Sequence, residues 1–99
     1  MCGATQVDDL SLEGVDVSKE AVIQGVVSRD GQPAGGTYVV LLDENGDFTA
    51  EVVTSATGAY RFTARPGSWN LRALAPGGVR VNATASADIG RVERVDISL

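Results

Sequence analysis

The thiol of Cys2 is the side chain best suited to covalent chemistry, because it is the single cysteine of the sequence. A small residue after Met1 favours removal of the methionine, which would place the thiol beside the terminal α-amino group and the flexible Gly3. The thiolate attacks sulfur, and a persulfide is one of its reversible products. Asp8 and Asp9 oppose this, since nearby negative charge raises the pKa of a thiol. Cys2 is therefore a candidate reactive thiol, and a terminal cysteine without a role is the alternative.

Histidine is absent from the sequence, which removes most other catalytic arrangements. Histidine is the commonest general base, the commonest transition-metal ligand and the usual partner of a serine or cysteine nucleophile. A single cysteine also excludes an intramolecular disulfide and a zinc site built from cysteines. We therefore expect a protein that is not an enzyme and that uses no metal and no cofactor.

One acidic segment matches the first half of a calcium-binding loop. Asp43, Asn45 and Asp47 occupy its first, third and fifth positions, but Phe48 stands where the loop needs glycine, and a threonine stands where it needs its last glutamate. Asn45 followed by Gly46 is typical of a tight type I′ hairpin turn, because both residue types tolerate a positive φ. The segment therefore predicts a hairpin turn and no calcium site.

Short runs of alternating apolar and polar residues begin at residue 21, and turn residues interrupt them about every 8–12 residues, a spacing typical of all-β proteins. Tyr60 and Phe62 share the inner face of one such run. Val92 is out of phase with the last run, which indicates a bulge or a late strand start. We predict a seven-stranded antiparallel, Greek-key-like β-sandwich over residues 21–99, preceded by an extended acidic leader over residues 1–20. The expected strands are 21–28, 37–43, 48–55, 60–64, 69–75, 79–85 and 91–99.

Three arginines alternate with the inward residues of three successive predicted strands. Arg61, Arg72 and Arg80 are therefore expected on the outside of the sandwich. In one row they could bind an anion such as thiosulfate, or an acidic partner. The alternative is that each pairs with an acid on a neighbouring strand and serves solubility.

The predicted strand over residues 37–43 is apolar on both faces. Tyr38, Val40 and Leu42 form the face that does not point into the core. A strand with one face in water should not show this pattern. We predict that these residues form an interface, covered either by the leader or by a second copy in a homodimer.

Charge and hydropathy limit the partners. The net charge is −5, and most of it lies in the leader, where five acids and one lysine give residues 1–20 a net charge of −4. An acidic chain is not expected to bind nucleic acid or an anionic membrane. No apolar run approaches the roughly 20 residues of a membrane helix, and no signal peptide is evident. The expected location is the cytoplasm.

Several short motifs carry a family resemblance, and they are Ile23-x-Gly25-x-Val27, Gly31-x-Pro33, Val39-x-Leu41, Gly58-x-Tyr60-x-Phe62 and Pro66-Gly67-x-Trp69. Their order resembles the carboxypeptidase regulatory-like, transthyretin-like β-sandwich. Further segments, namely Met1-Cys2-Gly3, Lys19-Glu20 and residues 48–53, 55–58 and 66–74, are similar to a small actinobacterial SseC-like family of unknown function. That resemblance implies, through gene neighbourhood, a link to sulfurtransferases of the rhodanese type.

The sequence therefore predicts a non-enzymatic accessory or interaction module linked to sulfur metabolism. In this hypothesis Cys2 docks to, or relays sulfur from, a rhodanese-type sulfurtransferase. The alternative is a structural or ligand-binding β-sandwich for a protein or a carbohydrate, in which Cys2 has no role.

Overall fold

The computed structural model describes residues 3–4 and 19–99, and all regular secondary structure in these ranges is β-strand. The turn spacing of the sequence predicts this result. The strands are β1 (Gly3–Ala4), β2 (Ala21–Arg29), β3 (Gln32–Pro33), β4 (Tyr38–Leu42), β5 (Phe48–Val53), β6 (Ala59–Ala64), β7 (Gly67–Ala75), β8 (Val79–Ala87), β9 (Val92–Arg94) and β10 (Ile97–Ser98).

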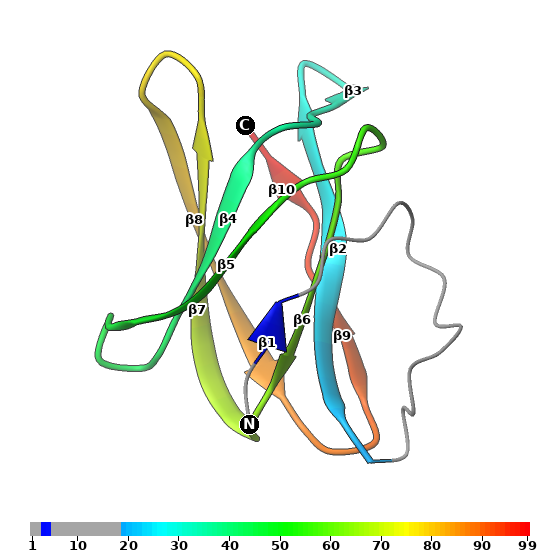
Figure 1. Cartoon of the computed structure of the whole chain (residues 1–99), viewed down its shortest axis with the longest axis vertical. Coiled ribbons are helices and arrows are strands. Elements are labelled where there is room, and N and C mark those ends of the chain that lie inside the picture. Colours follow the sequence, from blue (N-terminus) through cyan, green and yellow to red (C-terminus); the bar gives the residue numbers. More distant parts are fainter. Residues whose placement is uncertain (1–2, 5–18) are drawn as a thin grey trace.

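These strands form two sheets that pack face to face (Figure 1). One sheet has the order β1-β6-β2-β10, with β3 and β9 also paired to β2, and the other has the order β5-β4-β7-β8. The predicted all-β sandwich is confirmed. Strand β1 pairs antiparallel with β6, so residues 3–4 of the predicted leader belong to the first sheet. Residues 5–18 of that leader lie outside the described residues.

The core lies between the inner faces of the two sheets. Tyr60 and Phe62 of β6 are fully buried, as their alternation predicts, and their ring centroids lie 6.0 Å apart. Leu41 and Leu71 face them from the opposite sheet and are also fully buried. Burial of one such side chain contributes about 1.5–3 kcal/mol to folding. The two aromatic rings and the two leucines therefore account for much of the adhesion between the layers.

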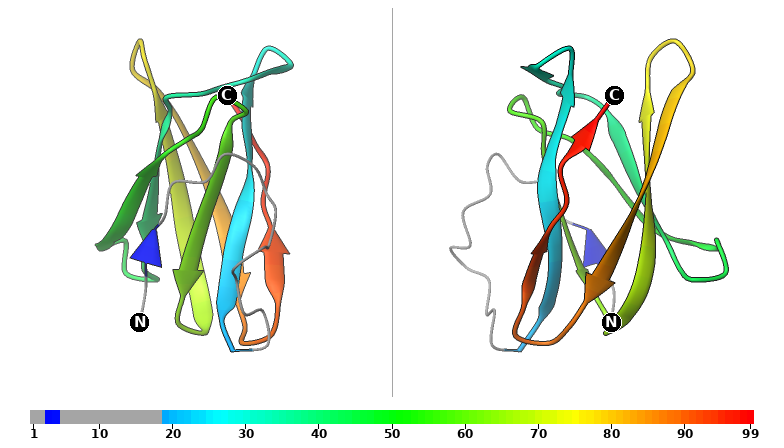
Figure 2. Two further views of the ribbon diagram at one scale, coloured as in Figure 1. Left: turned by 45° about the vertical axis from the view of Figure 1, so that its right-hand side comes forward. Right: turned by 180° about the vertical axis from the view of Figure 1, so that it is seen from behind.

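The last predicted strand differs from the expectation in two ways. It is broken into β9 and β10, and both pair with β2 in parallel rather than antiparallel (Figure 2). At the break, the Val95 N–H donates to the carbonyl of Gln24, and the Val26 N–H donates to the Asp96 side chain, each at 2.9 Å. The chain crosses from β8 in one sheet to β9 in the other. This crossing decides the direction of β9 and β10 relative to β2. The irregularity indicated by Val92 therefore lies just after β9, where an aspartate side chain replaces a backbone acceptor.

The tight type I′ turn lies at Asp30-Gly31 and not at Asn45-Gly46. Asp30 and Gly31 have φ values of 54° and 80°, and they join β2 to β3. Between β4 and β5 only Gly46 has a positive φ, of 83°, so the predicted turn type there is wrong. A longer turn is held instead by Asp43, whose Oδ1 accepts the N–H groups of Asn45 and Asp47 at 2.9 Å each. The aspartate that opened the calcium-like pattern is thus used by the hairpin.

Candidate functional site

The side of the β5-β4-β7-β8 sheet that faces away from the core is called the outer face here. Strand register places its side chains in rows, because residues opposite one another on neighbouring strands point to the same side. From one end to the other, successive rows read Val53–Tyr38–Leu74–Arg80, Glu51–Val40–Arg72–Asn82, Phe48–Leu42–Asn70–Thr84, and Ser68–Ser86.

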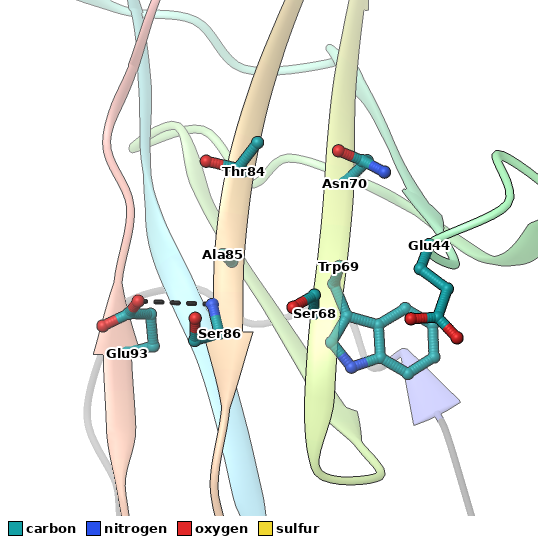
Figure 3. Close-up of a pocket in the computed structure, with 8 residues that line it drawn as sticks. All are labelled: Glu44, Ser68, Trp69, Asn70, Thr84, Ala85, Ser86 and Glu93. Carbon is teal, nitrogen blue, oxygen red and sulfur yellow. Dashed lines mark hydrogen bonds between the residues drawn. The ribbon is translucent and has the colours of Figure 1, made fainter.

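A groove of about 410 Å³ lies at the serine end of the outer face and is called the polar groove below (Figure 3). Strands β7 and β8 form its floor. Glu44, in the turn between β4 and β5, lies on one side of it, and Glu93, on β9, lies on the other. Its lining residues are Glu44, Ser68, Trp69, Asn70, Thr84, Ala85, Ser86 and Glu93.

Hydrogen bonds hold both sides of the polar groove. The Asn70 Nδ2 group donates to the carbonyl of Asp43 at 3.2 Å, which fixes the turn that carries Glu44. Glu93 accepts a hydrogen bond from the Ser86 N–H at 3.3 Å and pairs with Arg91 at 3.1 Å. The Ser86–Glu93 bond joins the edge of one sheet to β9 of the other. The groove is therefore part of the scaffold and does not depend on loop closure.

Several polar groups of the groove are available to a ligand. Within the described part of the chain, no hydrogen bond or ion pair engages the hydroxyls of Ser68, Thr84 and Ser86 or the carboxylate of Glu44. Each hydroxyl can donate one hydrogen bond and accept others, whereas an ionised carboxylate only accepts. None of the described residues that line the groove is an arginine or a lysine. The site therefore suits a ligand with hydroxyl or amine donors and does not suit an anion.

Trp69 closes the groove from below. Its side chain is 2% exposed and belongs to the core. Its indole N–H donates to the carbonyl of Arg65 at 3.0 Å, and the Arg65 guanidinium lies 4.7 Å from the ring centroid. Such a cation–π contact adds about 0.5–1 kcal/mol at an exposed position. Trp69 supports the groove, and its ring is too buried to stack on a ligand.

The predicted row of three arginines does not form, because β6 and β7 are consecutive in sequence but belong to different sheets. Arg61 lies on β6, is 7% exposed, and its Nε donates to the Gln24 side chain at 2.8 Å. Arg72 and Arg80 lie on the outer face of the opposite sheet. The Arg72 Nε donates to the Asn82 side chain at 3.2 Å. A single anion cannot contact all three.

The predicted interface residues do share one face. Tyr38, Val40 and Leu42 form the central column of the outer face, along β4. Val40 and Leu42 are each only 8% exposed, whereas Tyr38 is 49% exposed. Neighbouring side chains of the same sheet flank this column, so only part of it needs another cover. Cys2 lies outside the described residues, and Gly3 after it pairs with Thr63 of β6.

The polar groove was not expected from the sequence. Its signal is the polar residue at every second position near the start of β7 (Ser68, Asn70) and the end of β8 (Thr84, Ser86). Alternation alone indicates two ordinary strands that each have one face in water. The strand register is what places the polar pair of β7 beside the polar pair of β8. In residues 3–4 and 19–99, no group of three or more histidine, cysteine, aspartate or glutamate side chains could hold a metal ion. The same ranges contain no helix long and apolar enough to cross a membrane.

Solved structures with a similar fold include two aromatic-ring dioxygenases. Catechol 1,2-dioxygenase from Pseudomonas arvilla C-1 aligns with a TM-score of 0.59 and 14% identity over 96% of this chain, and the chain spans 55% of that protein. Chlorocatechol 1,2-dioxygenase from Pseudomonas putida aligns with a TM-score of 0.56 and 15% identity over 99% of this chain and 72% of that protein. At this identity the likeness shows a shared β-sandwich fold and nothing about activity.

Sequence relatives are much more similar. The uncharacterized proteins Rv0814c and Rv3118 of Mycobacterium tuberculosis are each 50% identical over 86 residues, which cover 86% of this chain and 85% of theirs. An uncharacterized protein of Mycolicibacterium smegmatis is 48% identical over 87 residues, which cover 87% of this chain and 96% of its own. The expectation of a family with actinobacterial members is confirmed. The family described as "Protein of unknown function (DUF1416)" matches residues 2–99, and the chain therefore belongs to the DUF1416 family.

Proposed function

We propose that this chain is a non-enzymatic binding module whose polar groove takes a neutral, polyhydroxylated ligand of the carbohydrate class. One observation carries the proposal: the Ser68, Thr84 and Ser86 hydroxyls and the Glu44 carboxylate line one groove without partners among the described residues. Polar groups in that state are solvated in the free protein and can exchange water for ligand.

The chemistry of the lining selects the ligand class. A sugar hydroxyl both donates and accepts, which matches serine and threonine hydroxyls, and its donor matches a carboxylate. Glu44 and Glu93, on opposite sides, disfavour an anion. Among the described lining residues only Ala85 and the buried Trp69 are apolar, which disfavours a hydrophobic ligand. The volume of about 410 Å³ lies within the range of about 300–1,000 Å³ typical of small-molecule sites.

Binding is proposed rather than catalysis, although two carboxylates flank the groove. A glycosidase needs one carboxyl group that remains protonated, and burial among apolar groups is the usual means. Glu44 is exposed, and Glu93 accepts hydrogen bonds from Arg91 and from the Ser86 N–H. The serine hydroxyls have no imidazole base, since the sequence has no histidine. Neither carboxylate thus has the surroundings of a general acid.

A nitrogen–proton NMR titration with a panel of neutral mono- and disaccharides tests this proposal. We expect at least one sugar to shift the amide signals of residues 68–70 and 84–86. Replacing both Ser68 and Ser86 by alanine should weaken that binding about tenfold, because each lost neutral hydrogen bond costs about 0.5–1.5 kcal/mol.

The control is Ser98→Ala, which removes an exposed hydroxyl from β10 and should leave the affinity unchanged. The absence of shifts at millimolar sugar, or shifts confined to other strands, would overturn the carbohydrate assignment. Cleavage of a disaccharide by the wild-type chain would overturn the non-enzymatic one.

A second candidate function is sulfur relay through Cys2, as the SseC-like resemblance implies. The supporting observation is that Gly3–Ala4 forms an edge strand on β6, so the chain immediately after the thiol is anchored to the sandwich. In this relay the Cys2 thiolate attacks the outer sulfur of a rhodanese persulfide. The sulfur–sulfur bond of the donor breaks, the donor leaves as a thiolate, and Cys2 becomes a persulfide.

Intact-mass measurement tests the relay. The chain lacking Met1 is incubated with thiosulfate and an active rhodanese, and we expect a gain of one sulfur atom. Cys2→Ser should abolish the gain. No gain in the wild type, with the rhodanese shown to be active, would leave the binding module alone.

A further inference from the structure

The outer face carries opposite charges on the two sides of its apolar column. Val40, in the middle of β4, lies directly between Glu51 of β5 and Arg72 of β7. Within the described residues neither of these two charges forms an ion pair, and Arg72 uses its Nε on Asn82. A guanidinium has five N–H donors in all, so most of those on Arg72 remain available.

One row of apolar groups on this face is arranged symmetrically about β4. Tyr38 lies between Val53 and Leu74, which are partly buried. Tyr38 and Phe48 are exposed by 49% and 66% and are two of the three large hydrophobic side chains most exposed in the described chain. Exposed aromatic side chains that adjoin an apolar column are typical of an interaction surface.

We propose that the outer face packs against the outer face of a second copy of this chain, related by a two-fold axis parallel to β4. This axis places β4 over β4 and exchanges β5 with β7. Glu51 then faces Arg72 of the second copy, and Arg72 faces its Glu51. Val40 meets Val40, and Val53 meets Leu74. A two-fold interface needs a self-complementary surface of this kind.

The charges distinguish this axis from its alternative. A two-fold axis perpendicular to the strands, in the same plane, would leave β5 over β5 and β7 over β7. Glu51 would then face Glu51, and Arg72 would face Arg72. Like charges across an interface disfavour the wrong arrangement. Both axes keep the strands of the two copies nearly aligned, which is the common geometry of packed sheets, so the charges alone choose between them.

The extent of the face predicts a reversible dimer. Only β5, β4 and β7 overlap in this arrangement, and three strands about 4.8 Å apart are about 14 Å across. So small a contact is typical of weak, transient complexes. The polar groove shares Asn70 and Thr84 with the Leu42 row, but neither Glu51 nor Arg72 is among its lining residues, so the charge argument for the dimer does not depend on the carbohydrate proposal.

Sedimentation velocity of the whole chain over a range of concentrations tests the dimer. We expect the wild type to shift from monomer to dimer as its concentration rises. Glu51→Arg and Arg72→Glu should each weaken dimerisation at least tenfold, because each variant places two like-charge pairs across its own interface.

An equimolar mixture of Glu51→Arg and Arg72→Glu is the decisive arm. One copy then carries arginine and the other glutamate at both positions, so the mixed dimer has opposite charges in both pairs. We expect the mixture to dimerise about as tightly as the wild type. An interaction inside one copy cannot produce this rescue.

Arg80→Glu is the matched control, since it makes the same charge change as Arg72→Glu. Arg80 lies on β8, which is outside the contact formed by β5, β4 and β7. It should dimerise like the wild type, and circular dichroism checks that every variant is folded. A wild type that stays monomeric at all concentrations, or a mixture that does not associate, would overturn the proposal.

Discussion

The carbonyl of Val95 passes directly over Gly25, at the place where any other residue would carry its β-carbon. The same carbonyl accepts the hydroxyl hydrogen of Tyr60, which is buried in the core. Because Gly25 in the middle of β2 has no β-carbon, the Val95 backbone can pass close to it at the break between β9 and β10. Tyr60 then provides the hydrogen-bond donor that the buried Val95 carbonyl needs.

Gly25→Ala should be among the most damaging single substitutions in the described chain. The added methyl group would overlap the Val95 backbone, so the end of the chain must move, and we expect a loss of about 3 kcal/mol. Urea unfolding measures this loss. Gly46→Ala is the comparison, because its methyl group would meet nothing within 4 Å and only its positive φ of 83° is unfavourable. Gly46→Ala should lose about 1 kcal/mol of stability, and equal losses at the two positions would contradict the proposed close approach of Val95 to Gly25.

The free energy of unfolding should fall in alkali because the buried Tyr60 keeps its proton in the folded state. Burial raises the pKa of Tyr60 above its usual value of 10, and the negative charge of Asp96 adds to this. Above pH 10 the unfolded chain loses the tyrosine proton while the folded chain keeps it, so the free energy of unfolding falls as pH rises. Below pH 10 both states keep the proton and no such dependence arises. We expect a loss of about 1 kcal/mol per pH unit between pH 10 and 11.5.

Urea unfolding at pH 9, 10 and 11 checks this dependence. Tyr60→Phe should lower stability at pH 9 by about 1–2 kcal/mol, since the Val95 carbonyl loses its side-chain donor, and should flatten the decline above pH 10. Tyr38→Phe is the control, because Tyr38 is half exposed on the outer face. If Tyr60→Phe declined as steeply as the wild type, another group would be responsible.

The Arg61–Gln24 pair should matter far more than the similar Arg72–Asn82 pair. In both, an arginine Nε donates to a side-chain amide oxygen, but the first is buried at 2.8 Å and the second is exposed at 3.2 Å. Removing a buried acceptor from a charged donor costs about 1.5–3 kcal/mol, whereas water replaces an exposed one. Thermal unfolding of Gln24→Ala and Asn82→Ala should show a large loss for the first and less than about 0.5 kcal/mol for the second.

Asp43 should stabilise the hairpin through its side-chain oxygen rather than its charge. Its Oδ1 accepts two backbone N–H groups, a pattern that an asparagine can also form. Asp43→Ala should therefore lose about 1–2 kcal/mol, while Asp43→Asn should lose less than about 0.5 kcal/mol. A large loss for Asp43→Asn, measured by urea unfolding, would show that the charge is essential.

Local sequence patterns predict most of the strands and their inner faces. Alternation with a period of two is local, so Tyr60 and Phe62 could be assigned to the core before any partner was known. Residue types at turns predict the turn geometry less well. Asp30-Gly31, an Asp-Gly pair of the kind that favours a type I′ turn, forms one, whereas the type I′ turn predicted at Asn45-Gly46 is wrong. There a third residue, Asp43, holds a longer turn through its side chain.

The choice of neighbouring strands depends on contacts between segments that are far apart in the sequence. Alternation predicts which face of a strand a side chain occupies but not which sheet the strand joins. The pattern therefore groups Arg61 with two arginines that lie on the opposite sheet. The direction of the last strand follows from the crossing out of β8, which no local pattern records. The polar groove depends on the register that sets Ser68 beside Ser86. Backbone hydrogen bonds between segments far apart in sequence fix that register, which is why the groove emerges only when the chain is folded.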